Sequence, residues 1–150
     1  MNFLGDNELT DHLESIIHEE TQLHDYHFDL TVTQIHRFTM AGALDFGGSE
    51  FKSAETEVVE LQKNSGDDYG WWHLSEGTYQ ATMNETLADI EDATAIVVPH
   101  SHLHQAGVTS STSIIPNPDD EPITMNLQVP SVGCNIKENA RIASLYLLSN

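Results

Sequence analysis

The sequence predicts a mostly β fold, a sandwich or barrel preceded by one helix, and three observations support this. Short segments with alternating apolar and polar residues recur at regular spacing. Gly-, Pro- and Asp-rich turn signals separate them. Only the segment at about residues 7–19 has the helical period. We see no internal repeat or linker in the 150 residues, so we expect a single domain over 1–150, with a β-domain from about 22 to 150.

The expected helix has one apolar stripe at positions i, i+4, i+7 and i+8, which is the pattern of a helix that covers a core. The stripe consists of Leu9, Leu13, Ile16 and Ile17. Its opposite side carries acidic residues and no lysine or arginine. A helix on a membrane surface would need basic residues there, so we expect this helix to cover the core.

The predicted strands are β-branched or alternate in polarity. They lie at residues 28–35, 57–61, 71–74, 78–83, 95–98, 123–129 and 140–148. The last of these, from Ala140 to Leu148, is apolar on both faces. Such a strand is either central in its own sheet or covered by another subunit, because an apolar strand left at a sheet edge invites aggregation.

Charge excludes several classes of partner. The chain carries 24 acidic and five basic residues, a formal net charge of −19. This field repels nucleic acid and anionic membranes, so we expect neither as a partner. The acids are spread along the chain rather than held in a tail, which favours a high-salt environment where the repulsion is screened. We find no signal peptide, so we expect a cytoplasmic or virion protein.

Three histidines follow the predicted strand at 95–98, at alternate positions: His100, His102 and His104. On an extended chain their imidazoles would converge and could bind Zn²⁺ or another divalent ion. On a helix only His100 and His104 would share a face. The alternatives are a polar turn and a contact between subunits. The single cysteine, Cys134, excludes an internal disulfide and a cysteine-rich metal site.

Four segments, in order, resemble the dUTPase and dCTP deaminase superfamily. They are Gln22 with Asp29-Leu-Thr-Val32, Leu74-x-x-Gly-x-Tyr79 with Asn84-Glu85, Val98-Pro-x-Ser-x-Leu103, and Ala140-Arg-Ile-Ala143. Together they cover about 120 residues. The resemblance is to the archaeal-type branch, and it implies a distorted β-barrel that assembles as a homotrimer with active sites between subunits.

The sequence departs from the family where the chemistry is expected. The family's two phosphate-binding arginines correspond to His100 and Gln105, and neither residue replaces a guanidinium. The family's Asp-x-Gly-Tyr-x-Gly hairpin corresponds to Pro116-Asn-Pro-Asp-Asp-Glu121. The outward positions aligned with the deaminase glutamate are Asn126 and Gln128, and neither side chain titrates. The resemblance leaves Ser101 and Asn126 as vestigial catalytic positions, and Ser101, Gln105 and Gly107 as ligand-binding candidates.

These losses favour a non-catalytic homotrimer, a structural or binding module that is possibly seated on a larger assembly such as a virus capsid, with no cofactor. One alternative is an active enzyme, a dUTP diphosphatase or dCTP deaminase that uses Mg²⁺. Another is a small metal-binding β-barrel built on the histidines. The expected partner is the chain itself, and possibly the larger assembly.

Overall fold

The computed structural model describes residues 1–88 and 90–149. The N-terminal half contains β1 (Asn2–Phe3), α1 (Asp6–Thr10), β2 (Leu13–Glu14), α2 (Glu19–Gln22), β3 (Phe28–Met40), β4 (Glu55–Val58) and β5 (Trp71–Leu74). The C-terminal half contains β6 (Gly77–Met83), β7 (Thr86–Leu87), β8 (Ala93–Pro99), α3 (Ser101–Gln105), β9 (Ser113–Pro116), β10 (Thr124–Val129), β11 (Cys134–Lys137) and β12 (Arg141–Ser149). The predicted mostly β fold is confirmed.

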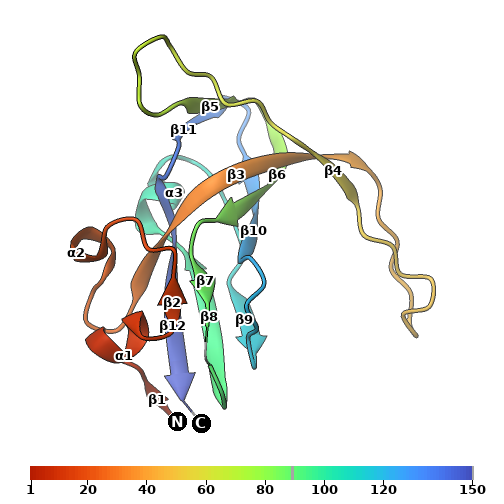
Figure 1. The fold of residues 1–150 in the computed structure, drawn as a ribbon. Helices are drawn as coiled ribbons and strands as arrows, with labels where there is room; N and C mark the ends of the chain where they lie inside the picture. The colour runs from red at the N-terminus through yellow and green to blue at the C-terminus, as the bar shows by residue number, and fades with distance from the viewer. Residues whose placement is uncertain (89, 150) are drawn as a thin grey trace.

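Within the described residues the strands form one large, curled antiparallel sheet and two small ones (Figure 1). The large sheet has the order β10-β6-β3-β12-β8-β9, with β1 added on β12 and β4 on β3. The small sheets pair β11 with β5 and β2 with β7. β3 is long and bends, so its first half pairs with β12 while its second half pairs with β6 and β4. This bend curls the sheet around the core.

β12 lies in the centre of the sheet. Leu145 of β12 is opposite Phe28 of β3 on one side and Val97 of β8 on the other. All three side chains are fully or almost fully buried. Full burial of an apolar side chain of this size contributes roughly 1.5–3 kcal/mol. Of the two positions predicted for this strand, the central one is confirmed, because β3 and β8 pair with its two edges.

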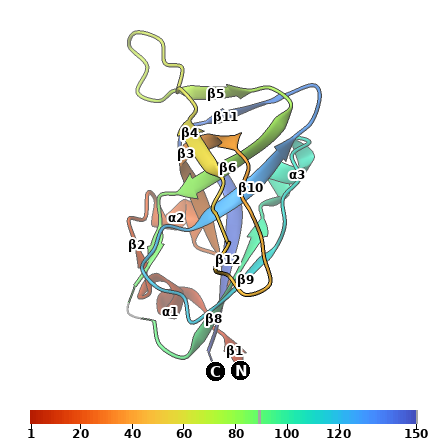
Figure 2. The ribbon, with the colours of Figure 1, turned by 90° about the vertical axis from the view of Figure 1, so that its right-hand side faces the viewer.

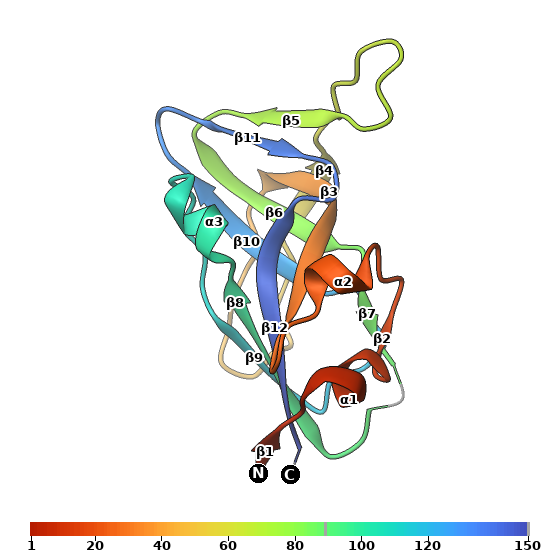
Figure 3. The ribbon, with the colours of Figure 1, turned by 90° about the vertical axis from the view of Figure 1, so that its left-hand side faces the viewer.

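The single helix expected over about residues 7–19 is divided into α1 and α2 (Figure 3). Leu13 and Glu14 between them form β2 and pair with β7, and Ser15 adopts a left-handed φ of 63°. The Gln22 side chain accepts the backbone N–H groups of Ile17 and His18. Pairing with β7 therefore overrides the local helical pattern, as tertiary contacts often do for short helices.

The hairpin between β3 and β4 projects from the body of the molecule on the right of Figure 1, and in Figure 2 it lies in front of the sheet. Its tip carries Leu44, Phe46 and Phe51, all of them largely exposed. Large apolar side chains gathered on a projecting segment are typical of an interaction surface. No helix in the part of the chain that the structure describes is long and apolar enough to cross a bilayer.

Candidate functional site

The short helix α3 follows β8 directly and carries most of the residues predicted to be functional. Its N-cap is His100, whose Nδ1 accepts the backbone N–H of His102 at 3.0 Å. Leu103 is buried and anchors the helix, whereas Ser101, His104 and Gln105 are exposed. The histidine run is thus helical rather than extended. This part of the fold does not gather the three imidazoles around one point.

A polar groove lies beside the segment that leaves α3. Gly107, with a φ of 88°, turns the chain so that Thr109 forms a bridge with Gln128 of β10. The Ser110 hydroxyl donates to the carbonyl oxygen of Asn126 at 2.6 Å. Two adjoining hollows of about 230 and 250 Å³ share Thr78, Thr109 and Gln128 in their lining.

The groove brings together some of the predicted residues and adds others. Gly107 lines one hollow and Asn126 lines the other, although 19 positions separate them in the sequence. Ser101 and Gln105 line neither. Sequence reasoning assigned no role to Thr109 and Ser110. The sequence shows a run of small hydroxyl residues here. It does not show that this run pairs with β10, because the contact joins segments that are distant in the sequence.

Another pocket, of about 340 Å³, lies against α3 and is lined by two basic side chains. Lys137 and Arg141 line it together with His102 and Ala106 of the α3 region. The Lys137 ammonium lies 5.7 Å from the centre of the Trp71 ring, which is within cation–π range. Sequence reasoning also missed this pocket. The sequence feature that could have indicated it is the spacing of Lys137 and Arg141, two of the chain's five basic residues, which are four positions apart.

Asp29, near the start of β3, is the centre of a polar cluster beneath α3. Its side chain is only 2% exposed. Oδ1 accepts the Ser144 hydroxyl at 3.0 Å, and Oδ2 accepts Arg141 at 3.0 Å. Three imidazole Nε2 atoms surround the same carboxylate: those of His24 at 3.0 Å, His100 at 3.5 Å and His27 at 3.6 Å. His100, at the position of a family arginine, therefore contacts Asp29.

The protonation states within this cluster follow from burial and from neighbouring charges. Burial disfavours the Asp29 carboxylate, but hydrogen bonds from His24 and Ser144 outweigh it and hold its pKa below the usual value. Burial lowers the pKa of His100, and burial with the neighbouring His24 lowers that of His27. At neutral pH the cluster therefore pairs one carboxylate with the Arg141 guanidinium, while His27 and His100 are neutral.

A second buried carboxylate, Glu85, fixes the start of β3. It is fully buried and accepts the backbone N–H and the hydroxyl of Thr31, together with the side-chain amide of Gln22. The same Gln22 amide also donates to the Asp29 carbonyl oxygen at 2.8 Å. Gln22 and Glu85, two residues of the sequence resemblance, thus hold the strand that carries Asp29 rather than lining a pocket.

No family model matches the sequence. A probable deoxyuridine 5'-triphosphate nucleotidohydrolase of Methanosarcina mazei is 32% identical over 134 residues, which are 89% of this chain and 75% of that protein. One of Methanosarcina acetivorans is 31% identical and is matched over 97% of this chain and 86% of its own length. The solved structure of 2'-deoxycytidine 5'-triphosphate deaminase from Agrobacterium tumefaciens superposes with a TM-score of 0.68 at 15% identity. That match covers 97% of this chain but 47% of the deaminase, so it supports the fold alone.

These relatives correct one interpretation of the sequence. The expected role as a non-catalytic structural module, such as a trimer on a virus capsid, is wrong, because the relatives matched over most of the chain are named as nucleotidohydrolases. The missing arginines suggested the loss of activity. The cation pocket of Lys137 and Arg141 shows that positive charge is present beside α3 from another part of the chain.

Proposed function

Because the chain belongs to the dUTPase and dCTP deaminase superfamily, we propose that it hydrolyses dUTP to dUMP and diphosphate. The observation that carries the proposal is that adjacent residues after α3 line a polar groove and a pocket that contains two basic side chains. Gly107 lines the groove and Ala106, the preceding residue, lines the cation pocket. A nucleotide has the same two parts, a base with hydrogen-bonding edges and an anionic triphosphate.

The groove offers the groups that a uracil base requires. A uracil edge presents one N–H donor between two carbonyl acceptors, and a side-chain amide both donates and accepts. Asn126 and Gln128 are exposed on β10 and provide two amides. Thr109 and Ser110 line the groove beside them and add two hydroxyl groups. A few convergent polar groups of this kind orient a ligand and give specificity.

The triphosphate end requires positive charge, because the net charge of −19 repels a free nucleotide. Lys137 provides this charge in place of the arginines expected at positions 100 and 105, beside Arg141, which is already paired with Asp29. The family resemblance adds Ser101, whose side chain is exposed on α3 outside the lining of the pocket. The substrate is then the Mg²⁺ complex of dUTP, since Mg²⁺ binds through phosphate oxygens and retains several of its waters. The ion reduces the charge that the acidic protein must accept.

Hydrolysis is favoured over deamination by the residue on β10. The deaminase branch of the superfamily uses a glutamate there as a general acid and base, and this chain has Asn126. A carboxamide does not exchange protons near neutral pH, so it cannot perform this step. We therefore propose the hydrolase and not the deaminase.

We predict diphosphate release from dUTP in the presence of Mg²⁺ and no ammonia release from dCTP. Replacing Ser101 by alanine should lower kcat/KM for dUTP by at least about tenfold, the effect of one lost hydrogen bond to a charged group. Ser65→Ala, in an exposed loop, is the matched control and should leave the rate unchanged. The absence of diphosphate release with either deoxypyrimidine triphosphate would contradict the proposal.

We also propose that the active form is a homotrimer with its sites between subunits, as the family resemblance implies. The projecting apolar tip with Leu44, Phe46 and Phe51 supports self-association, because an exposed surface of this kind is rare on a monomer. Light scattering at micromolar concentration and in molar salt should give the mass of three chains. Phe46→Asp should reduce that mass, and a monomeric wild type under these conditions would contradict the trimer.

A further inference from the structure

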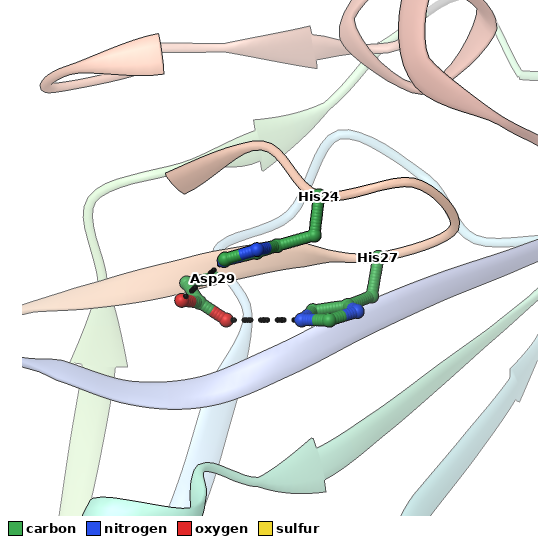
Figure 4. Close-up of side chains that lie close together, drawn as sticks. All are labelled: His24, His27 and Asp29. Atoms are coloured by element: carbon green, nitrogen blue, oxygen red, sulfur yellow. Dashed lines mark hydrogen bonds and ion pairs between the residues drawn. The ribbon is translucent and has the colours of Figure 1, made fainter. Parts of the chain in front are cut away.

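His24 and His27 are held face to face by a tight turn at the start of β3. The His24 backbone N–H donates to the His27 carbonyl oxygen at 2.9 Å. The two residues that flank this turn, Leu23 and Phe28, form a β-bridge. Only Asp25 and Tyr26 separate the two histidines. Their rings stack with centroids 4.4 Å apart and planes 16° apart. Both rings direct Nε2 toward the Asp29 carboxylate (Figure 4).

The spacing of these atoms is close to that of a metal coordination sphere. Zn–N bonds of about 2.0–2.1 Å at tetrahedral angles place neighbouring ligand atoms about 3.3 Å apart. The Asp29 oxygens lie 3.0 Å from His24 Nε2 and 3.6 Å from His27 Nε2. One ligand atom from each of the three residues lies within 4.8 Å of the others. We propose that His24, His27 and Asp29 bind a divalent transition-metal ion such as Zn²⁺.

The hydrogen bonds assign His24 and His27, rather than His100, as the imidazole ligands. An imidazole that binds a metal through Nε2 must be neutral with its proton on Nδ1. In His100, Nδ1 accepts the backbone N–H of His102, so the neutral ring carries its proton on Nε2. Without the ion, His24 donates Nε2–H to Asp29. The side chains of His24 and His27 are partly exposed, at 41% and 31%, so when Nε2 binds the ion the proton can move to Nδ1, where water accepts it.

The remaining neighbours orient the carboxylate. Ser144 donates to Oδ1, Arg141 to Oδ2, and His100 directs Nε2–H toward the same group. Such outer partners fix the direction of a ligand and are typical of metal sites. Arg141 also adds a positive charge beside the ion, while Asp25 in the turn and the net charge of −19 act in the opposite direction. Two imidazoles and one carboxylate leave a coordination position open to solvent, which is typical of sites that bind a further ligand.

This inference is independent of the proposed hydrolase, because it is tested by binding and not by turnover. Protein prepared without a histidine tag is titrated with ZnCl₂ by calorimetry and with Co²⁺ by visible absorption, which reports the coordination geometry. We expect one equivalent of Zn²⁺ and a spectrum of four- or five-coordinate Co²⁺. His24→Asn and His27→Asn should each weaken the affinity by at least about tenfold.

His104→Asn is the matched control, since His104 is exposed on α3 and lies outside the cluster. It should leave the affinity within twofold of the wild type. Circular dichroism checks that each variant is folded, and the second histidine variant provides the test should the first not fold. Three outcomes would overturn the site: several weak equivalents on the acidic surface, unchanged affinity in both cluster variants, or a loss confined to His104→Asn. The last would instead favour the run of His100, His102 and His104.

Discussion

Replacing Glu85 by alanine is expected to lower the free energy of unfolding by roughly 3–5 kcal/mol, enough to unfold many domains. Glu85 is fully buried and accepts three hydrogen bonds, two from Thr31 and one from Gln22. Each buried donor that is left without an acceptor costs about 1–3 kcal/mol. Denaturant unfolding monitored by fluorescence measures the loss directly.

Two further variants test whether the lost hydrogen bonds cause the loss of stability in Glu85→Ala. Glu85→Gln preserves the shape and one acceptor oxygen, so it should cost less, about 1–3 kcal/mol. Glu60→Ala removes an exposed acid and should change stability by no more than about 0.5 kcal/mol. If Glu85→Ala unfolds at the same denaturant concentration as the wild type, the network around Thr31 does not hold β3 in place.

Replacing Lys137 by alanine is expected to raise KM for Mg²⁺–dUTP by about 10- to 100-fold, with little change in stability. The lysine contacts Trp71 and lines the cation pocket, and a charge-assisted bond to phosphate is among the stronger hydrogen bonds in proteins. Steady-state kinetics and a thermal melt separate the two effects. Lys137→Arg keeps the charge and should retain most of the affinity.

Lys63→Ala is the control for this second prediction. Lys63 is one of three lysines, is exposed, and does not line the cation pocket. It should change KM by less than about twofold, because its exposed ammonium does not line the pocket and is screened by salt. Equal effects of the two lysines would mean that the total charge of the protein, and not the pocket beside α3, controls nucleotide binding.

The sheet was predictable from the sequence because its signal is local. Met125, Leu127 and Val129 alternate with polar residues and form the buried face of β10, and the buried Ile123 directly precedes the strand. The helix expected over about 7–19 failed for the opposite reason. Its apolar period is real, but Leu13 and Glu14 gain more from pairing with β7 than from continuing a short helix.

The candidate site was less predictable because its members are distant in the sequence. Asp29 meets Arg141 and Ser144 only because β12 pairs with β3. Lys137 and Arg141 both line the pocket beside α3, although Lys137 is placed by the pairing of β11 with β5. The family motif predicts arginines at positions 100 and 105, where this chain has no permanent positive charge. It did not indicate where else in the fold a cation could be supplied.

The central position of β12 has a consequence for how the chain folds. Leu145 pairs with Phe28, 117 positions earlier, and the ladder between β3 and β12 cannot form until that long loop closes. Contacts of such sequence separation slow folding to milliseconds or seconds. During synthesis, β3 and β8 emerge before β12, the strand that pairs with both of them. Their apolar faces are then open to other chains, and refolding yield should fall as protein concentration rises.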